Sequence, residues 1–586
     1  MAHLAATAER ARLVTPACVV VRRIVPAHGP WPEDVPGVLQ RVYAARGVLR
    51  PEDAELKLAK LLPPDSMGGI ELAVDLLRNA ICAHQHIVIV GDFDCDGATG
   101  TAVAVRGLRM LGATRVSYQV PHRIKHGYGL SPGLVEDIAD VQPDLLVTVD
   151  NGIACHAGIA AAKARGWQVL VTDHHLPGAE LPEADAIVNP NLGGDAFQSK
   201  ALAGVGVMFY LLLALRRDLR ERGEIAVPEP DLSSLLDLVA VGTVADLVPL
   251  DYNNRLLVAA GLRRMREGKC QAGLRALAKV SGRSLESLST GDIGFSIAPR
   301  LNAAGRLEDM GLGIECLLCD DPAQADALAT MLDRINGERR TRQQDMIADA
   351  DALVECLPMS DAVLPAALSL FDPTWHPGVV GLVASRLKDR LHRPVIAFAP
   401  AEEGSTLLRG SARSIPGFHI RDALAAVNAR RPEWIERFGG HAMAAGMTLR
   451  LEYLEVFRQA FAEYALEVIA AESLNAELAS DGPLAPSELH RALAERLQSA
   501  GPWGQGFAEP LFDNVFEVRE WRVLGQRHLK FVLEHADGGA SVPAIHFGGW
   551  GGIGPPERIH AAYQLDLDDY RGRNGVQLLI RQWQPA

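Results

Sequence analysis

The sequence predicts an α/β protein with three parts: a parallel-sheet domain, a second, smaller α/β domain joined to it by a long helix, and a C-terminal β-barrel. Apolar runs of strand length alternate with helical stretches between about residues 70 and 250. A helical pattern from about 315 to 358 is polar in its middle, and short alternating segments follow from about 475. Strands that are apolar on both faces and alternate with helices are typical of a parallel sheet covered by helices. A chain of 586 residues is also too long for one ordinary core.

We expect the first domain over residues 71–315, with an N-terminal segment, residues 1–70, packed on it. A helix (101–112) and a further strand (116–120) fit the alternation of this domain. Three of its apolar runs end in aspartate or in aspartate and histidine: HIVIVGDFD (86–94), DLLVTVD (144–150) and GWQVLVTDHH (166–175). Ligands bind at the carboxyl ends of the strands in such sheets, so these strand ends are the first sign of a functional site.

A connecting helix is expected over residues 316–358. An apolar stripe runs along its first part and resumes in its last part, through Leu328, Met331, Leu332, Ile335, Met346, Ala350 and Leu353. The stretch between them, NGERRTRQQD (336–345), has no apolar side chain and carries Arg339, Arg340 and Arg342. A helix that is apolar at both ends and polar in its middle is typical of a connector between two domains, although a solvated helix face gives the same pattern.

The second α/β domain is expected over residues 359–474 and the β-rich tail over residues 475–586. In the former, RPVIAFAP predicts a strand, GFHIRDALAAV a helix, and FGGHAMAAGMTL a glycine-rich turn that leads into a strand. In the latter, VFEVREWRVL, HLKFVLEH and LDLDDYRGRNGVQLLIRQW alternate, and GRNG predicts a hairpin turn. Such a tail indicates a small β-barrel or sandwich, with an OB-like barrel as one candidate.

The composition excludes some classes of protein and leaves a nuclease open. A net charge of −14 and a pI of about 5.7 argue against a basic coat protein for nucleic acid, but metal-binding carboxylates add negative charge and basic residues can still line one groove. No apolar run approaches the roughly 20 residues of a membrane helix, and the N-terminus lacks a signal-peptide pattern. Eight irregularly spaced cysteines favour reduced thiols in the cytoplasm. The pair in CLLC (316–319) fits a buried helix face better than a zinc or redox site.

The stretch GDFDCDGATG (91–100) begins like an EF-hand calcium loop, but it does not continue as one. An EF-hand needs a bidentate glutamate at its twelfth position, and counted from Asp92 that position is Val103. A strand also precedes the stretch where an EF-hand has a helix. Capping of the following helix explains at most one of the aspartates Asp92, Asp94 and Asp96. The remaining hypothesis is a catalytic metal site.

Three further stretches carry acids or histidines, and each has an ordinary explanation when taken alone. Asp150 in TVDNG is a common turn former. The neighbours Asp173, His174 and His175 in TDHHLPG fit a buried histidine bonded to a carboxylate. Asp246 in VAVGTVADLVPL follows an apolar run that we expect to be another strand. The ends of neighbouring parallel strands lie about 4.8 Å apart, so we expect these groups to meet in one cleft.

A cluster of four or five aspartates with one or two histidines requires a cation, because each buried carboxylate otherwise costs several kcal/mol. Hard oxygen ligands together with imidazole suit Mn²⁺ or Mg²⁺ rather than a thiolate zinc site. Aspartate-rich sites for paired metals favour phosphoryl transfer to water. The residues alone therefore predict a hydrolytic metal site.

In their order along the chain, Asp-x-Asp-x-Asp-Gly, Thr-Val-Asp-Asn-Gly, Asp-His-His and Val-Ala-Asp resemble the DHH phosphoesterase superfamily, and above all its RecJ branch of single-strand-specific DNA exonucleases. The resemblance extends over nearly the whole chain through RVYAARGV, GYGLSP, ALAGVGV, PRLNAAGRL, WHPGVVG, GSARSIPGFHIRDAL, FGGHAMAAG and GPWGQGF. It implies a DHH domain, a DHHA1-type domain and an OB-like barrel. It also implies a 5′→3′ exonuclease for single-stranded DNA that acts in DNA repair and recombination.

The same resemblance implies one or two bound Mn²⁺ or Mg²⁺ ions. Their ligands would be Asp92, Asp94, Asp96, Asp150, His174 and Asp246. His175 would lie beside the scissile phosphate, and Asp173 would orient the pair of histidines. A sister branch of oligoribonucleases and pyrophosphatases has a histidine where this chain has Asp92, which favours the exonuclease branch.

Further residues are candidates for binding DNA. Arg123 and Tyr128 in PHRIKHGYGLS (121–131) offer a cation for phosphate beside an aromatic ring for stacking, unless the loop is a generic one. The resemblance makes Arg300, Asn302 and Arg306 of PRLNAAGRL phosphate contacts, and it implies a pocket for the terminal phosphate at Ser411, Arg413, Gly439, Gly440 and His441. Glycines beside a histidine let backbone N–H groups approach an anion closely. His376 in WHPGVVG is expected to be structural.

We expect single-stranded DNA as the substrate, single-strand-binding protein and other repair or recombination proteins as partners, no membrane contact, a monomer, and a cytoplasmic, nucleoid-associated location. Two alternatives remain. A small-substrate DHH phosphodiesterase, for short oligonucleotides or cyclic dinucleotides, would not need the β-rich tail. A DNA-binding scaffold with a vestigial site would not need the complete set of acids and histidines.

Overall fold

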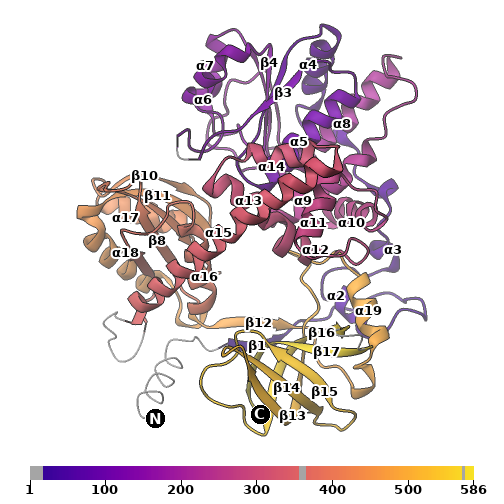
Figure 1. Ribbon diagram of the computed structural model, residues 1–586, viewed down its shortest axis with the longest axis vertical. Coiled ribbons are helices and arrows are strands. Elements are labelled where there is room, and N and C mark those ends of the chain that lie inside the picture. Colours follow the sequence, from indigo (N-terminus) through magenta and orange to yellow (C-terminus); the bar gives the residue numbers. More distant parts are fainter. Residues whose placement is uncertain (1–17, 124, 356–363, 570–573) are drawn as a thin grey trace. The chain divides into compact units, whose positions relative to one another are not determined.

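The computed structural model describes residues 18–123, 125–355, 364–569 and 574–586 (Figure 1). The chain forms two compact units. The first contains Pro51–Glu338 and Gly501–Glu509, and the second contains the described residues up to Arg50, within Arg339–Ala500 and within Pro510–Ala586. No helix in the described ranges is both long and apolar enough to cross a membrane.

The first unit contains a five-stranded sheet whose neighbouring strands are all parallel, as the sequence predicts. In spatial order its strands are β3 (Val116–Gln119), β2 (Ile87–Val90), β4 (Leu145–Val149), β5 (Gln168–Thr172) and β6 (Ala186–Val188). Val90 pairs with Gln119 and Thr148, so the carboxyl ends of these strands lie at one edge of the sheet. The central strands β2 and β4 are buried throughout, which explains why they lack polar alternation.

Helices cover both faces of this sheet. The helices α6 (Pro132–Asp137) and α7 (His156–Ala164) share one buried apolar cluster with β2, β4 and β5. On the other face lie α4 (Ile70–Cys82), α5 (Cys95–Met110) and α8 (Gly204–Glu221), which also pack on one another (Figure 1). The two faces are therefore closed, and the ends of the strands are left to carry polar groups.

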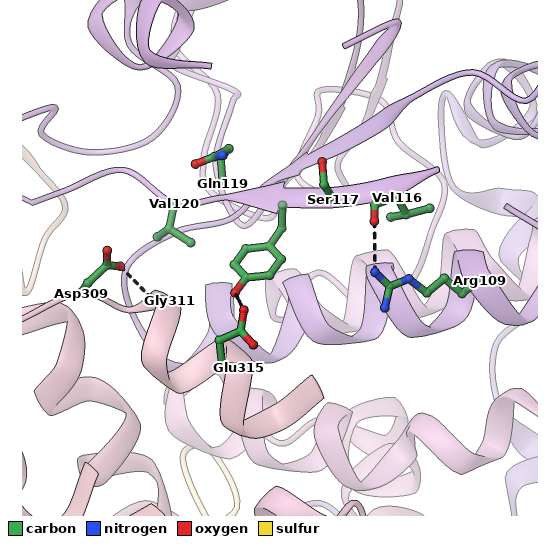
Figure 2. Close-up of a pocket in the computed structure, with 9 residues that line it drawn as sticks. Arg109, Val116, Ser117, Gln119, Val120, Asp309, Gly311 and Glu315 are labelled. Carbon is green, nitrogen blue, oxygen red and sulfur yellow. Dashed lines mark hydrogen bonds between the residues drawn. The ribbon is translucent and has the colours of Figure 1, made fainter. Parts of the chain in front are cut away.

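The edge strand β3 is protected by side chains from two helices (Figure 2). Arg109 of α5 donates a hydrogen bond from Nη2 to the carbonyl of Val116 (3.1 Å), and the hydroxyl of Tyr118 donates to Oε1 of Glu315 (2.5 Å). Glu315 lies on α14 (Gly311–Leu318). A polar pocket of about 450 Å³ remains between this edge and the two helices. Such covering is a common way to prevent an edge strand from pairing with another chain.

The rest of the first unit is helical, and it corrects one expectation. The run VAVGTVA before Asp246 is not a strand but the end of α9 (Leu236–Ala245), which is buried on all sides. A short, uniformly apolar run does not distinguish a buried strand from a buried helix. After α9 the chain continues with α10 (Tyr252–Arg266), α11 (Ala272–Val280), α12 (Thr290–Asp292), a π-helix (Ile293–Ile297) and α13 (Ala298–Leu307), and the short helix α3 (Pro51–Ala54) begins the unit.

The long helix α15 spans Pro322–Glu355, and the predicted residues 356–358 lie outside the described part of the chain. It begins later than expected because residues up to Leu318 form the separate helix α14, whose buried Cys316 agrees with the interpretation of CLLC as a helix face. The buried side chains at its two ends are Ala325, Ala329, Leu332, Ile335, Met346, Ala350 and Val354. The boundary between the two units, at Glu338 and Arg339, falls within the polar middle.

The second unit contains a mixed five-stranded sheet, in which β7 and β8 are parallel and the other pairs antiparallel. Its strands in spatial order are β10 (Ile435–Gly440), β11 (Ala444–Arg450), β9 (Leu407–Arg413), β8 (Val395–Pro400) and β7 (Leu368–Phe371). The helices α17 (Ile420–Arg430) and α18 (Leu454–Val468) pack on one face through a phenylalanine-rich core, and α16 (Val380–Leu391) packs on β8 and β9.

The tail of the second unit forms a closed barrel, which confirms the expected OB-like barrel. Its strands in barrel order are β13 (Phe512–Leu524), β14 (His528–His535), β15 (Val542–His546), β17 (Gly575–Pro585) and β16 (Arg558–Asp568). The first half of the expected GRNG hairpin turn (572–575) lies outside the described residues, and β16 and β17 pair antiparallel on either side of the turn. The helix α19 (Arg491–Ser499) precedes the barrel.

The N-terminal segment does not pack as expected. Residues 18–50 belong to the second unit, where β1 (Cys18–Arg22) pairs parallel with β12 (Ala476–Ser480) and α2 (Gly37–Ala44) follows. Arg46 forms an ion pair with Asp481 at 2.7 Å. Only the part from Pro51 onward joins the first unit. These contacts join residues more than 400 positions apart, which no local pattern reveals.

Asp513 ties the N-terminal strand to the barrel. Its carboxylate accepts hydrogen bonds from Arg22 Nη2 (2.8 Å) and Ser480 Oγ (2.5 Å), and it lies 2.9 Å from His560 Nε2. Burial alone raises the pKa of Asp513, but the bonds from Arg22, Ser480 and His560 outweigh it and lower the pKa to about 2. The ionised carboxylate therefore stabilises the fold.

We expect Asp513→Asn to lower the free energy of unfolding of the second unit by about 1–2 kcal/mol at pH 6, allowing for solvent screening. Because the pKa is depressed on folding, this contribution is present above the unfolded pKa near 3.9 and is lost as the pH falls through about 2. Urea unfolding of both proteins at pH 6 and pH 2.5 measures it, with the exposed Asp537→Asn as the matched control. Equal midpoints for the wild type and Asp513→Asn at pH 6 would contradict the expectation.

Candidate metal centre

The acids of the first motif lie directly after β2 and at the start of α5. Asp94 is the N-cap of this helix, and its Oδ1 accepts hydrogen bonds from the backbone N–H groups of Asp96 (2.9 Å) and Gly97 (3.1 Å). Capping therefore accounts for Asp94, one of the three aspartates. Asp92 and Asp96 are buried, with 3% and 1% of their surfaces exposed, and neither is a cap of this helix.

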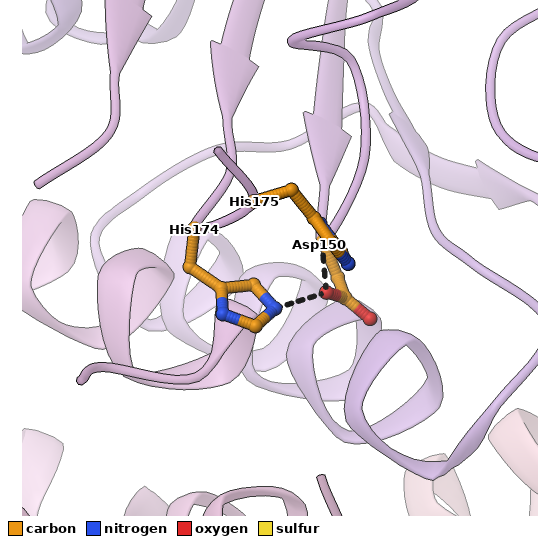
Figure 3. A group of neighbouring side chains, drawn as sticks. All are labelled: Asp150, His174 and His175. Carbon is orange, nitrogen blue, oxygen red and sulfur yellow. Dashed lines mark hydrogen bonds and ion pairs between the residues drawn. The ribbon is translucent and has the colours of Figure 1, made fainter. Parts of the chain in front are cut away.

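The ends of β4 and β5 bring the next groups to the same edge of the sheet. Figure 3 shows that His174 and His175 face Asp150, and His174 Nε2 lies 3.0 Å from Asp150 Oδ1. Asp150 has a left-handed backbone, with φ of 63°, so the interpretation of TVDNG as a turn also holds. Asp246 reaches the cluster from the end of α9, with Oδ2 3.5 Å from His174 Nε2. Strand ends and one helix end thus meet as predicted.

Three overlapping groups of these side chains have ligand atoms within 4.8 Å of one another, which suits a metal ion. They are Asp92, Asp94 and Asp150; Asp96, His174 and Asp246; and Asp150, His174 and His175. The first two groups share no residue, so the cluster offers donors for more than one ion. All six predicted metal ligands are brought together.

The carboxylates of the cluster are poorly neutralised by the protein alone. Burial, followed by repulsion from neighbouring aspartates, raises the pKa of Asp92, Asp150 and Asp246 well above the ordinary value, and it raises the pKa of Asp96 to about 7. Asp92 Oδ1 and Asp246 Oδ2 are buried without a hydrogen-bond partner in the described part of the chain. Divalent cations held by the groups to which Asp92 and Asp246 belong would satisfy these oxygens, so the residues present fit Mn²⁺ or Mg²⁺.

His175 is held by Asp173, as expected. The carboxylate oxygen Oδ1 of Asp173 lies 2.7 Å from His175 Nδ1 and accepts the backbone N–H groups of both histidines. Burial favours the neutral imidazole, but the hydrogen bond and the charge of Asp173 outweigh it and raise the pKa of His175 to about 9. His175 is therefore a cation in the metal-free site at neutral pH, and it can donate a hydrogen bond to an anion.

Glycines allow the helices to approach the cluster, a role that the sequence analysis missed. The N–H groups of Gly204 (2.6 Å) and Val205 (2.9 Å), at the start of α8, hold the carboxylate of Asp96. A Cβ on Gly204 would lie only 2.5 Å from Asp150 Cβ, and one on Gly242 would lie 3.0 Å from Asp96 Oδ1. Only glycine fits such close approaches, and the signals in the sequence were the first glycine of ALAGVGV and the glycine of VAVGTVA.

The loop after β3 places both of its predicted DNA-binding residues beside the cluster. The guanidinium of Arg123 lies 3.8 Å from the centre of the Phe93 ring, and its Nε donates to the carbonyl of Gly305 (3.0 Å). The hydroxyl of Tyr128 donates to the carbonyl of Asp150 (2.8 Å) and lies 3.2 Å from His175 Nδ1. Tyr128 is still 46% exposed, so its ring remains accessible to a base.

The residues of PRLNAAGRL are placed differently from the prediction. Arg300 is only 7% exposed and is engaged by Asp333 (2.8 Å) and by the carbonyl of Ser296 (2.6 Å). Asn302 accepts the backbone N–H of Cys95 through its Oδ1 (2.8 Å), so it fixes the first residue of α5, between Asp94 and Asp96. These contacts favour structural roles for Arg300 and Asn302 over direct phosphate contacts. Arg306 lies half-buried on the same helix.

In the second unit, Ser411 and Arg413 face the same side of β9, and Arg413 Nη1 donates to Ser411 Oγ (3.0 Å). Burial lowers the pKa of Arg413, and no carboxylate of the described residues pairs with it. A Cβ on Gly381, in the first turn of α16, would lie 2.9 Å from Ser411 Oγ and 3.1 Å from Arg413 Nη2. A partly buried cation beside a helix start is a suitable site for an anion.

The glycine-rich segment lies on the neighbouring strands. Gly439 and Gly440 end β10, Ser411 pairs with Gly446 on β11, and Gly446 pairs with Gly439. The N–H of His441 donates to the carbonyl of Ala444 (2.8 Å) and closes the turn between β10 and β11. The predicted pocket residues thus lie on β9, on β10 and in the turn after β10, and β11 separates the two strands in the sheet. Their role in binding phosphate stays a prediction.

Models of three families match the chain in the expected order. The DHH family, N-terminal domain, matches residues 86–243, the DHHA1 domain matches residues 362–467, and the RecJ OB domain matches residues 480–582. They cover the parallel sheet, the mixed sheet and the barrel.

Relatives match the chain over almost its whole length. The single-stranded-DNA-specific exonuclease RecJ of Dickeya dadantii is 50% identical, over 96% of this chain and 99% of the relative. That of Escherichia coli is 47% identical, over 95% and 98% of the two chains. The crystal structure of RecJ in complex with Mn²⁺ from Thermus thermophilus superposes with a TM-score of 0.77 at 33% identity, over 93% of this chain and 76% of that chain. The complex with Mg²⁺ gives 0.73 at 31% identity, over 93% and 74%.

Proposed function

The chain belongs to the RecJ family of single-stranded-DNA-specific exonucleases, and we propose that it removes nucleotides from the 5′ end of single-stranded DNA in repair and recombination. It is a metal-dependent phosphodiester hydrolase. The observation that carries this function is the convergence of buried aspartates and two histidines at one edge of the parallel sheet. Relatives of nearly equal length share the name of this activity.

The cofactor is Mn²⁺ or Mg²⁺, with which the related Thermus thermophilus protein was crystallised. The residues that would hold it are Asp92, Asp94, Asp96, Asp150, His174 and Asp246. When bound, such ions lower the pKa of water and neutralise the charge of a phosphate. The protein contributes the orientation of the ligands, through the N–H groups of α8 on Asp96 and through Asn302 on the first motif.

Other side chains would bind the DNA beside the metals. His175, whose ring is held in place by Asp173, is suited to contact the scissile phosphate. The exposed ring of Tyr128 is suited to stacking on a base, and Arg123 would contribute positive charge next to it. These roles are proposals from the geometry.

The anion site at Ser411 and Arg413 would bind the terminal phosphate and so define the 5′ end. Its support is a partly buried guanidinium without an acid partner in the described residues, beside the start of a helix. A phosphate would satisfy that charge. This pocket gives a physical basis for the proposed 5′→3′ direction.

We expect Arg413→Ala to remove the preference for a 5′-phosphorylated end over a 5′-hydroxyl end, with a loss of about 10-fold or more in kcat/KM on the phosphorylated substrate. Rates on the two substrates measure it. Arg421→Ala is the matched control, because Arg421 is exposed on α17, which packs on the opposite face of the sheet. If Arg413→Ala keeps the wild-type preference, the pocket proposal is wrong.

The experiment that tests the function is a time course on single-stranded DNA labelled at one end or the other. We expect release of nucleotides from the 5′ end with Mn²⁺ or Mg²⁺, no cleavage with a chelator, and little cleavage of a blunt duplex. Release from the 3′ end first would overturn the direction. Preferential cleavage of dinucleotides over long strands would instead favour the small-substrate phosphodiesterase.

The remaining proposals concern partners and location. We expect single-strand-binding protein and other repair or recombination proteins to bind the enzyme, which would act as a monomer in the nucleoid of the cytoplasm. The support is that an exonuclease for single-stranded DNA finds its substrate where DNA repair produces single strands, and these strands are covered by single-strand-binding protein.

A further inference from the structure

A short segment of the C-terminal region belongs to the first unit. It is Gly501–Glu509, with the sequence GPWGQGFAE, and we call it the strap. The residues on either side of it, in α19 and β13, belong to the second unit. The residues of the motif GPWGQGF within it belong neither to the proposed metal ligands nor to the proposed DNA contacts. The strap packs on the turn that follows Asp246.

That turn has a strained backbone. The N–H of Leu247 bonds to the carbonyl of Val244 (3.4 Å) and ends α9, and Leu247 adopts a left-handed conformation with φ of 60°. Its side chain is 69% exposed, so no burial of the leucine offsets the strain. A residue other than glycine persists in this conformation only when its surroundings impose it.

The strap supplies contacts that fix the far end of the turn. The N–H of Leu250 donates to the carbonyl of Gln505 at 2.7 Å. Gly504 lies against the same leucine, since a Cβ there would be 2.8 Å from Leu250 Cδ1. Gly506 has φ of 72°, and a Cβ on it would be 3.3 Å from Pro249 Cβ. Two glycines thus let the strap approach the turn closely.

The strap is itself anchored to the first unit. The rings of Trp503 and Phe507 stack at 5.1 Å, and the guanidinium of Arg255 lies 4.2 Å from the centre of the Phe507 ring. The hydroxyl of Thr290 donates to the carbonyl of Trp503 (2.6 Å). Arg255 and Thr290 lie on α10 and α12, so the strap joins the turn to two further helices.

Asp246 lacks the backbone hydrogen bonds that orient two of its neighbours. The carboxylates of Asp96 and Asp173 are oriented by backbone N–H groups, whereas Asp246 Oδ2 is buried without a hydrogen-bond donor in the described part of the chain. The direction of the Asp246 side chain is therefore set by the backbone around it. The backbone is in turn held at Leu250 by the strap.

We propose that the strap is a positioning element for the metal centre, which holds the turn 246–250 so that Asp246 points at the bound ion. This inference rests on the proposed function of Asp246 as a metal ligand. The affinity for metal would then depend on a segment of the C-terminal region that lies more than 250 positions from Asp246 in the sequence.

The test is the affinity for Mn²⁺, measured by calorimetry on the full-length protein without DNA. We expect Gly504→Val to weaken Mn²⁺ binding by about 10-fold or more, in the range found when groups that orient metal ligands are removed. Cleavage by this variant should recover towards the wild-type kcat at high Mn²⁺, and DNA binding in chelator should be unchanged. Gly504→Ala, which adds only the Cβ, serves if the larger variant fails to fold.

Gln505→Ala is the matched control, because the Gln505 side chain is exposed and its bond to Leu250 uses the main-chain carbonyl. It should bind Mn²⁺ like the wild type. Wild-type affinity in both Gly504 variants, with only a lower melting temperature, would overturn the proposal. Asp246→Ala distinguishes the proposed role of the strap from the proposed role of Asp246 as a metal ligand. If this variant also binds Mn²⁺ normally, Asp246 is not a metal ligand, and the error is not in the role of the strap alone.

Discussion

Replacing Asp150 or His174 with alanine is expected to abolish cleavage of single-stranded DNA while leaving its binding intact. Asp150 belongs to two of the three groups of potential ligands, and His174 Nε2 lies within 4 Å of Asp150, Asp96 and Asp246. Loss of either side chain removes a shared ligand. We expect kcat to fall by roughly 10³-fold or more, because a bound metal contributes several kcal/mol to the stabilisation of the transition state.

The retained binding has a physical reason. Removing Asp150 takes away a negative charge that repels DNA, and the proposed contacts at Tyr128 and Arg413 lie on other elements. Single-turnover cleavage at saturating Mn²⁺, together with DNA binding in chelator, measures both effects. His156→Ala is a suitable control, because His156 is exposed at the start of α7 in the same unit. Persistent cleavage by a clean preparation of either variant would contradict the assignment of the metal ligands.

The central features of this site could be predicted from the sequence because they depend on local patterns. The strands β2, β4 and β5 are apolar on both faces, and their ends carry Asp92, Asp150 and His174. A parallel arrangement then brings these ends together without further information. Asp246 was placed correctly in the cluster but on the wrong type of element, since α9 is as uniformly apolar as a buried strand.

The remaining features depend on contacts between distant residues. Asn302 holds the backbone of Cys95 from 207 positions away, and Asp333 engages the guanidinium of Arg300 in a salt bridge. The local sequence does not reveal either contact, because arginine and asparagine are also common in sites that bind phosphate. The same is true of residues 18–50, whose place in the second unit depends on pairing with β12.

Gly204→Ala, at the start of α8, is expected to weaken Mn²⁺ binding and to lower kcat/KM by about 100-fold. Groups that orient metal ligands contribute roughly 10- to 100-fold to metal affinity. The added Cβ would lie 2.5 Å from the Cβ and 2.8 Å from the Cα of Asp150. Asp150 has a left-handed backbone and cannot move aside easily. The helix must shift instead, and its N–H groups then lose their bonds to Asp96.

Gly206→Ala on the same helix is the matched control for Gly204→Ala. A Cβ there meets only the side chain of Leu202, at 3.2 Å, and alanine is the better helix former. Its activity and Mn²⁺ affinity should equal those of the wild type. Calorimetry with Mn²⁺ and thermal unfolding of both variants separate a local effect from a loss of fold. If Gly204→Ala binds Mn²⁺ normally, α8 does not orient the metal ligands. If both variants lose affinity equally, the effect belongs to the stability of the helix rather than to the close approach of Gly204 to Asp150.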